Sequence, residues 1–291
     1  MRIAQLSDLH ILDLESVRLT DFFSKRLTGG INLLTRRRNA HPLELAERLI
    51  EDVSKQAPDH VVVTGDVTNL SLPGEFQRAS RLLRALGGFP RLTVIPGNHD
   101  VYTAGAERQQ RFEAYFGELL FGEEFRPGEH VYPAIKDVGD AVIVGLSSAI
   151  KTKPFYATGR IGEEQLGRVV EALSAPEMKD RFKVVLLHHN LHTRGARADA
   201  HKGLLDRAVV LEKLQTLGVD LVLHGHTHRA HRFAVTRDDH TMLVIGSGSS
   251  TQNTDDPDMS ARYNIYTIDG KLRRIRTRVF DRQRRRFEWL V

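Results

Sequence analysis

Five short apolar runs in this chain each end in a segment of polar side chains that can bind metal ions. The runs are residues 3–6, 61–63, 92–95, 184–187 and 221–223. The polar segments that follow them are Asp8-Leu9-His10, Gly65-Asp66, Gly97-Asn98-His99-Asp100, His188-His189 and Gly225-His226-Thr227-His228. In an open α/β sheet, ligands bind in the crevice at the carboxyl ends of the strands. Five segments that are far apart in the sequence are therefore expected to meet at one site of an α/β fold.

Short apolar strands alternate with amphipathic helices along the chain, which is typical of α/β layering. Strands are predicted at residues 2–7, 60–64, 91–95, 141–147, 183–187, 220–224 and 242–246. Helices are predicted after His41-Pro42, with an apolar stripe over residues 45–53, and at residues 74–86, 163–173 and 203–217. The chain has no internal repeat or low-complexity linker, so we predict a single domain over residues 1–291.

Two segments fall outside this alternation. Residues 12–41 mix aromatic and aliphatic side chains with lysine and arginine and leave directly from His10. We expect this segment to form a cap beside the five polar segments that can bind metal ions. The alternative is a helical hairpin packed on its own domain. Residues 271–291 are predicted to form a basic strand pair. Its first strand is expected to be a solvated edge strand, whose charges prevent edge-to-edge pairing.

The chain contains no cysteine, so any metal must be held by nitrogen and oxygen ligands. The formal net charge of +5 favours anionic partners, such as phosphorylated metabolites, nucleic acid or an acidic membrane surface. A run of about 18 apolar residues is absent, which argues against a transmembrane helix. The start of the chain lacks the apolar stretch of a signal peptide. We therefore expect a cytoplasmic protein, with peripheral membrane attachment left open.

The residue types suit a centre of two metal ions. Asp8 and His10 lie two positions apart, as do His226 and His228, so on a regular strand each pair points the same way. Asp66, at a strand-to-loop corner, is the natural carboxylate to bridge two cations. The predicted ligands are Asp8, His10, Asp66, Asn98, His188, His226 and His228. This mixed nitrogen and oxygen set suits manganese, iron, zinc or cobalt better than calcium.

Such a centre predicts a hydrolase that acts on phosphoesters. Two cations about 3.5–4 Å apart generate a bridging hydroxide and hold the phosphoryl oxygens during an in-line displacement. His99 is not needed as a ligand and is predicted to protonate the leaving oxygen as a general acid. Asp100 is predicted to orient the His99 imidazole and to stabilise its protonated form.

The ordered motifs D-x-H, GD, GNHD, H and GHTH resemble those of the calcineurin-like metallophosphoesterase superfamily. The resemblance runs from Asp8 to His228, and the motif pattern is closest to the class III cyclic nucleotide phosphodiesterases. It implies a four-layer β-sandwich flanked by helices. Asn190 and Asn69 depart from the family pattern, because many relatives have proline and aspartate at these positions. Neither is a predicted ligand, so these departures bear on substrate preference rather than on the metal centre.

The resemblance also implies how the ligands divide between two ions. One ion would be held by Asp8, His10, Asp66 and His228, and the other by Asp66, Asn98, His188 and His226. By the same resemblance, His99 would contact the phosphate and assist the leaving group. Within the His188-His189 pair, His188 is the predicted ligand because the ligand of the family directly follows the strand.

The leading interpretation is a metal-dependent phosphodiesterase with a cyclic nucleotide as its substrate. The alternative is a hydrolase of a lipid-linked phosphodiester or pyrophosphate, as in relatives that hydrolyse UDP-diacylglucosamine. In that case residues 12–41 would contact an anionic membrane. A nuclease would need a separate DNA-reading domain, for which the chain after residue 230 is too short. A non-catalytic scaffold, such as the retromer subunit that resembles this fold, would lack metal ligands or the catalytic histidine.

Other polar residues near the motifs have further predicted roles. Asn69, Tyr102 and Arg160 are candidate substrate contacts, although a solvated arginine at a helix start is the alternative for Arg160. Four histidines are expected to lie around the site without binding metal: His189, His192, His224 and His231. A further five are expected to be surface or capping histidines: His41, His60, His130, His201 and His240.

Overall fold

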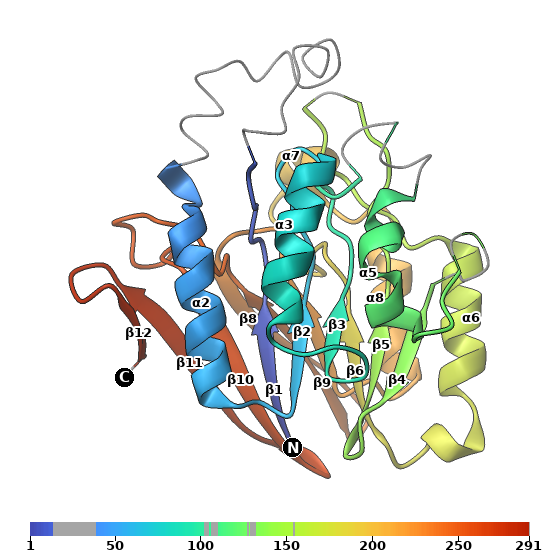
Figure 1. The fold of residues 1–291 in the computed structure, drawn as a ribbon. Helices are drawn as coiled ribbons and strands as arrows, with labels where there is room; N and C mark the ends of the chain where they lie inside the picture. Colours follow the sequence, from blue (N-terminus) through green and yellow to red (C-terminus); the bar gives the residue numbers. More distant parts are fainter. Residues whose placement is uncertain are drawn as a thin grey trace.

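Two six-stranded β-sheets lie face to face in the computed structural model, with helices on both outer sides (Figure 1). The structure describes residues 1–13, 39–101, 105, 110–126, 128, 132–153 and 155–290. The predicted four-layer α/β sandwich is confirmed, and all seven predicted strands are present to within two residues at each end. The predicted cap at residues 12–41 falls mainly on residues 14–38, which lie, like Tyr102, outside the described residues.

The first sheet has the strand order β12-β11-β10-β1-β2-β3. Its strands are β1 (Arg2–Leu6), β2 (His60–Val63), β3 (Leu92–Val94), β10 (Arg262–Asp269), β11 (Lys271–Asp281) and β12 (Arg286–Trp289). The first three strands are parallel, whereas β10, β11 and β12 add to β1 in antiparallel steps. Helices α2 (Leu43–Gln56) and α3 (Pro73–Arg84) lead into β2 and β3 and cover the outer face of this sheet (Figure 1).

The second sheet has the strand order β4-β5-β6-β7-β9-β8. Its strands are β4 (Ala134–Asp137), β5 (Ala141–Gly145), β6 (Phe182–Leu186), β7 (Leu221–His224), β8 (Ala230–Arg237) and β9 (His240–Ser247). The four central strands are parallel, and the edge strands β4 and β8 are antiparallel. The remaining helices are α5 (Arg111–Phe121), α6 (Glu163–Leu173), the 3₁₀ turn η3 (Pro176–Met178), α7 (Ala196–Lys202) and α8 (Arg207–Thr216). In the described part of the chain, no helix is both long and apolar enough to span a membrane.

Alternating side chains of the second sheet explain the layering. Because successive residues of a strand point to opposite faces, Val184 packs in the cluster shared with the first sheet, whereas Val185 packs against the outer helices. The outer cluster contains Leu166 of α6 and Leu214 of α8. Strands buried on both faces are typical of parallel sheets covered by helices. Each fully buried aliphatic side chain contributes about 1.5–3 kcal/mol.

The helix predicted at residues 203–217 is wrong in its first part. The chain forms α7 before Gly203 and α8 only from Arg207 onward. Between them, Leu204 forms a β-bridge with Gly159, and the Asp206 carboxylate accepts the backbone N–H groups of Ile161 and Gly162. These contacts with the segment before α6 hold the backbone extended at Gly203, which ends the helix.

The predicted solvated edge strand is also corrected. β11 lies inside the first sheet, and the edge is β12. Arg278 of β11 is buried and pairs with Asp52 of α2 through two hydrogen bonds of 2.6 and 2.7 Å. The Arg276 guanidinium stacks over the Trp289 ring at 3.6 Å. Arg276 and Arg278 therefore join β11 to β12 and α2, whereas Arg274 is exposed.

Candidate metal centre

The carboxyl ends of parallel strands from both sheets bring the predicted ligands together. Asp8 and His10 follow β1, and Asp66 and Asn98 follow β2 and β3. The second sheet supplies His188 after β6, and His226 and His228 after β7. Most of these side chains are buried although they are polar or charged, and His228 is the most exposed. A buried charged cluster of this kind needs compensating partners.

The backbone at these positions is strained. The φ angle is +51° at Asp8, +46° at His10, +54° at Asp66, +70° at His226 and +56° at His228. Residues other than glycine rarely adopt this left-handed region, and each instance costs on the order of 1–3 kcal/mol. These left-handed positions let the chain turn sharply at the ends of β1, β2 and β7. Asp8 and His10 then share one donor group, whereas His226 and His228 enter different groups.

The glycines of the motifs allow backbone and ligands to approach closely. A Cβ atom on Gly97 would lie 2.2 Å from Asp66 Oδ1, and one on Gly225 would lie 2.6 Å from Asp8 Oδ2. Both distances are far below van der Waals contact. A side chain at either glycine would therefore displace a carboxylate of the centre.

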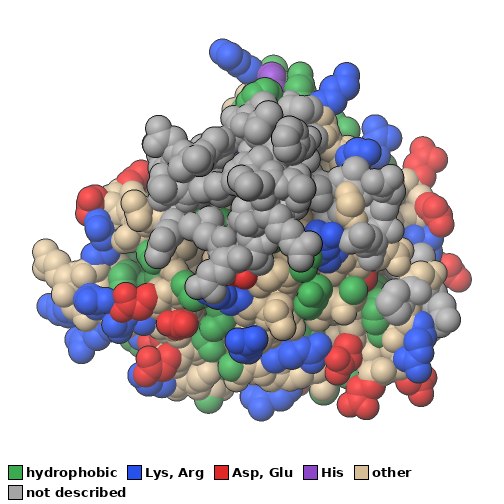
Figure 2. All heavy atoms as spheres, turned by 45° about the horizontal axis from the view of Figure 1, so that its top comes forward, with side chains coloured by type: hydrophobic (Ala, Val, Ile, Leu, Met, Phe, Trp, Pro, Cys, Tyr) green, Lys and Arg blue, Asp and Glu red, His purple; other side chains and the backbone are tan. Residues whose placement is uncertain are grey.

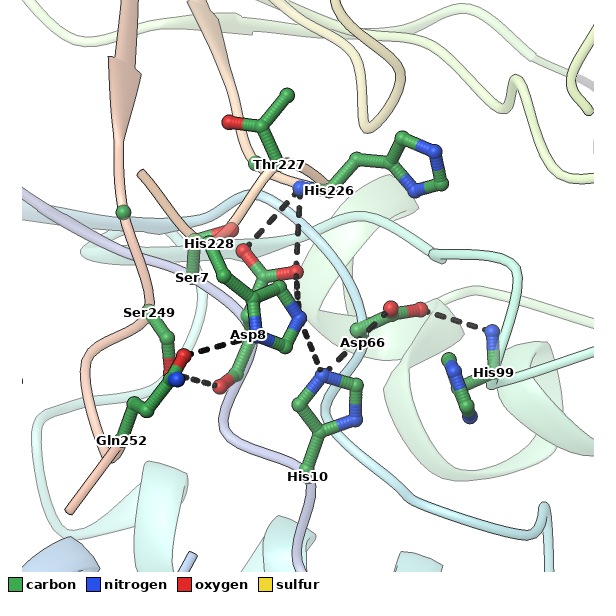
Figure 3. Close-up of polar contacts among 12 residues, drawn as sticks. Ser7, Asp8, His10, Asp66, His99, His226, Thr227, His228, Ser249 and Gln252 are labelled. Carbon is green, nitrogen blue, oxygen red and sulfur yellow. Dashed lines mark hydrogen bonds and ion pairs between the residues drawn. The ribbon is translucent and has the colours of Figure 1, made fainter. Parts of the chain in front are cut away.

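One group of donors gathers around Asp8, His10, Asp66 and His228 (Figure 3). His228 Nε2 lies 3.4 Å from Asp8 Oδ1 and 3.0 Å from His10 Nε2. His10 Nε2 lies 3.8 Å from Asp66 Oδ2. These atoms come from three different strand ends, and Asp8 and Asp66 each also place an oxygen within 4.8 Å of a nitrogen of His188.

A second group shares Asp66 with the first. His188 Nε2 lies 3.3 Å from Asp66 Oδ2 and 3.2 Å from Asn98 Oδ1. His226 Nδ1 lies 2.9 Å from the same Asn98 oxygen. Asp66 thus stands between the two groups, as a bridging carboxylate must.

The tautomers of three histidines fit metal coordination. His188 Nδ1 lies 2.8 Å from the Thr64 carbonyl oxygen, and His226 Nε2 lies 2.8 Å from the Lys202 carbonyl oxygen. A carbonyl only accepts hydrogen bonds, so these nitrogens carry an N–H and the opposite ring nitrogen faces the other predicted ligands. His228 Nδ1 is held in the same way by Gln252 Oε1 at 3.0 Å. Such hydrogen bonds commonly orient histidines that bind metals.

The pKa values of the histidines at the centre also favour the binding of a cation. Burial lowers the pKa of His10 and His226 well below the usual value and keeps both imidazoles neutral, which is the form that binds metal. Burial also opposes protonation of His188, but the neighbouring Asp66 carboxylate outweighs it and raises the pKa of His188 to about 9. The space between Asp66 and His188 attracts a proton, and the same negative charge would attract a metal cation.

His99 lies beside the first group of donors. Its backbone N–H donates to Asp66 Oδ1 at 2.8 Å (Figure 3), and its ring Nδ1 lies 2.8 Å from the Asn69 carbonyl oxygen. His99, His10 and Asp66 each place a ligand-type atom within 4.8 Å of the others. Because Nδ1 donates to a carbonyl, Nε2 is the ring nitrogen on the opposite side from this hydrogen bond.

The predicted role of Asp100 is wrong. Its buried carboxylate does not contact the His99 ring but accepts hydrogen bonds from the backbone of Val67, Thr68 and Gly97 and from the Thr68 hydroxyl. These bonds tie the loop after β2 to the loop after β3. Asp100 therefore fixes the loops that carry Asp66 and Asn98, and the Asn69 carbonyl orients His99 instead.

The structure describes two of the three predicted substrate contacts, Asn69 and Arg160, and also His189. Asn69 is buried, and its backbone carbonyl is the group that reaches His99. Tyr102 lies outside the described residues. Arg160 is exposed, and its backbone N–H donates to the Ser148 carbonyl. His189 uses one ring nitrogen toward Ser148 Oγ and the other toward the Ala157 carbonyl, so His188 is the histidine of this pair that reaches Asp66.

A loop that the motifs did not reveal surrounds the first group. It follows β9, and Ser249 Oγ donates to the Asp8 carbonyl while Gln252 accepts from His228 (Figure 3). Thr251 Oγ1 donates to the Leu9 carbonyl and lies 2.9 Å from His41 Nδ1. The polar run 247–253 directly after the predicted strand 242–246 is a sixth strand end with polar residues, and this signal could have identified it.

The fold and the paired donor groups define a dimetal phosphoesterase. A family model described as calcineurin-like phosphoesterase matches residues 1–230. The chain therefore belongs to the calcineurin-like phosphoesterases.

Similar proteins agree with this assignment. A stretch of 46 residues is 50% identical to a glycerophosphodiester phosphodiesterase (GpdQ) from Enterobacter lignolyticus, and it covers 16% of this chain and 16% of that protein. A dimetal phosphatase from Danio rerio has a similar structure, with a TM-score of 0.58 and 15% identity over 95% of this chain and 94% of that one. A purple acid phosphatase from yellow lupin (Lupinus luteus) has a TM-score of 0.63 and 12% identity over 99% and 52% of the two chains. Both structures share the fold.

Proposed function

We propose that this protein hydrolyses phosphodiesters at a centre of two metal ions. The observation that carries the proposal is the convergence of seven ligand-type side chains around a shared Asp66, with His99 beside them. Metal ions bound by these residues would supply Lewis-acid activation of water and of the phosphoryl oxygens. The donor types favour manganese, iron, zinc or cobalt.

His99 has the task of delivering a proton to the leaving oxygen. The Asn69 carbonyl holds Nδ1, so Nε2 is the nitrogen that would donate to a phosphoester oxygen. A positioned general acid contributes about 10²–10⁴-fold to the rate.

The preference for a diester over a monoester is supported by the name of the GpdQ relative, which is a glycerophosphodiester phosphodiesterase.

A cyclic nucleotide is the leading substrate. A groove of about 650 Å³ is lined by Phe155, Arg194, Arg197, His201 and Lys202, among others. Lys202 connects this groove with the centre, because its backbone carbonyl accepts the N–H of the predicted ligand His226. An aromatic ring on which a base can stack, together with basic side chains, suits a nucleotide.

The same groove supports a second candidate, a lipid-linked phosphodiester or pyrophosphate at an anionic membrane surface. Phe155 is 78% exposed and the next residue, Tyr156, is 42% exposed, so two adjacent aromatic residues face solvent beside the basic side chains of the groove. Figure 2 shows basic and hydrophobic side chains together at the upper edge of the view. Aromatic and basic residues side by side are typical of surfaces that bind anionic membranes.

Hydrolysis of bis(p-nitrophenyl) phosphate and p-nitrophenyl phosphate tests the diester proposal, with Mn²⁺ or with a chelator. We expect Mn²⁺-dependent cleavage of the diester well above that of the monoester. Monoester cleavage at an equal or higher rate would contradict the proposal. Cyclic nucleotides are then compared with glycerophosphodiesters and lipid diesters as substrates.

Flotation with anionic and neutral liposomes separates the two candidate substrates. The lipid candidate predicts that the intact chain floats with anionic vesicles, and that Phe155→Ser or deletion of residues 14–38 reduces flotation. A matched control is Leu290→Ser, since Leu290 is 61% exposed at the end of β12. Absence of flotation by the intact chain would remove the basis of the lipid candidate.

A further inference from the structure

His41 is expected from the sequence to be a surface or capping histidine, but the structure brings it to the centre. Its ring centroid lies 4.7 Å from that of His10 and 5.8 Å from that of His228. One ring nitrogen each of His10, His41 and His228 lies within 4.8 Å of the others. His41 is half-buried and precedes α2, far along the chain from the five motifs.

The hydrogen bonds of Thr251 determine the tautomer of His41. The Thr251 hydroxyl has a single proton, which it donates to the Leu9 carbonyl oxygen at 2.8 Å. The Asp8 carbonyl oxygen lies 3.3 Å from the same hydroxyl and can share this proton. Thr251 Oγ1 can therefore only accept a hydrogen bond from His41 Nδ1, which lies 2.9 Å away. His41 Nδ1 carries the N–H, and Nε2 is the basic nitrogen. His188, His226 and His228 are prepared for a metal in the same way.

The backbone around His41 is attached to the loop that also orients the predicted ligands. The backbone N–H of Asn253 donates to the Ala40 carbonyl at 2.7 Å, and its side-chain amide donates to the Asn39 carbonyl at 3.3 Å. The neighbouring Gln252 accepts from His228 at 3.0 Å. One loop thus sets the position of His41 and His228 together.

We propose that His41 is an eighth ligand, which binds through Nε2 to the ion held by Asp8, His10, Asp66 and His228. The proposal rests on the proposed metal centre and adds to it. Five protein ligands leave one open position on a six-coordinate ion, whereas zinc prefers four ligands in a tetrahedron. His41 therefore biases this position toward Mn²⁺ or Fe²⁺ and away from Zn²⁺.

The test is equilibrium binding of Mn²⁺ and of Zn²⁺ to the metal-free protein, with metal analysis of the bound ions. The wild type is expected to bind two Mn²⁺ ions per chain. In His41→Ala, one of the two Mn²⁺ sites is expected to weaken by more than the roughly 10–100-fold that is typical of groups that only orient ligands. The affinity for Zn²⁺ is expected to change less. His41→Gln serves as a second variant, and a thermal melt of each metal-free variant verifies folding.

His240→Ala is the matched control, because His240 is a half-buried histidine with one ring nitrogen at 2.9 Å from a backbone carbonyl, that of Val219. It is expected to leave both Mn²⁺ affinities unchanged. Two Mn²⁺ sites of wild-type affinity in His41→Ala and His41→Gln would overturn the proposal, even if KM for the diester rises. Failure of the wild type to bind two ions would instead contradict the proposed function itself.

Discussion

His99 and Asp100 are neighbours in the sequence but have different tasks. The Asn69 carbonyl orients the His99 ring through Nδ1, and the proposed proton donor is Nε2. The Asp100 carboxylate accepts hydrogen bonds from the ends of two strands, and burial together with the nearby Asp66 charge raises the pKa of Asp100 to about 7. One residue therefore acts on the substrate and the other positions the loops that carry the ligands.

This division predicts that two substitutions affect different properties, turnover in one case and stability in the other. His99→Ala should lower kcat by about 10²–10⁴-fold, as expected for loss of a general acid, while both metal ions stay bound. Asp100→Asn should lower the free energy of unfolding by about 1–3 kcal/mol, because its amide turns a donor toward backbone N–H groups that need an acceptor. Steady-state kinetics, metal analysis and urea unfolding measure the three quantities.

Unimpaired turnover of His99→Ala would remove His99 from the reaction. An unchanged unfolding midpoint for Asp100→Asn would show that the loops do not depend on this carboxylate.

At the scale of elements, the attachment of the antiparallel strands to α2 depends on one ion pair. Asp52 of α2 accepts two hydrogen bonds from Arg278 of β11 and one of 2.6 Å from the Tyr263 hydroxyl of β10. All three partners are at least half-buried. α2 ends the connection from β1 to β2, so this pair links the motif-bearing strands to the C-terminal strands.

Asp52→Ala should destabilise the protein by about 3 kcal/mol, since removal of one partner leaves a largely buried guanidinium without its charge partner. The matched control is Glu51→Ala on the same helix. Glu51 pairs with Lys55 on the exposed surface, where an ion pair contributes about 0–1 kcal/mol. Urea unfolding of both variants measures the difference. Equal effects of the two substitutions would contradict a special role for the Asp52 contacts.

Buried neutral histidines make the whole molecule sensitive to acid. His60 of β2 lies far along the strand from the metal centre, and its Nε2 is 2.9 Å from Thr93 Oγ1. Burial, with Lys136 and Arg91 nearby, lowers the pKa of His60 to about 3. The unfolded chain binds a proton here below about pH 6.5, whereas the folded protein does so only near pH 3. Stability is therefore full above pH 6.5 and is lost as the pH falls toward 3.

His60→Gln should remove the uptake of one proton on unfolding and so reduce the pH dependence of the free energy of unfolding. Between pH 7 and pH 5, the wild type should lose about 2 kcal/mol more than the variant, at about 1.4 kcal/mol per pH unit below pH 6.5. Urea unfolding of the metal-free proteins at both pH values measures this. The same loss in wild type and variant would show that His60 takes up a proton in the folded state.

The strands and the seven converging side chains are predictable because strand-end motifs are local in sequence and the sheets gather them. The polar run 247–253 could have been recognised as a further strand end, but the contact of Thr251 with His41 could not be predicted, since only the fold brings residues 41 and 251–253 together. The break at Gly203 depends on pairing with Gly159, which outweighs the local helix pattern. The task of Asp100 depends on backbone N–H groups, which have no sequence signature.

The central claim is a centre of two metal ions joined by Asp66, and metal content with turnover tests it most directly. The measurement is the number of ions per chain and the rate of diester hydrolysis, for wild type and Asp66→Ala. The wild type should hold two ions, whereas Asp66→Ala should lose stoichiometric binding of both and should hydrolyse the diester at a rate near background. A wild type with fewer than two ions, or an Asp66→Ala variant that keeps two ions and turnover, would contradict the claim.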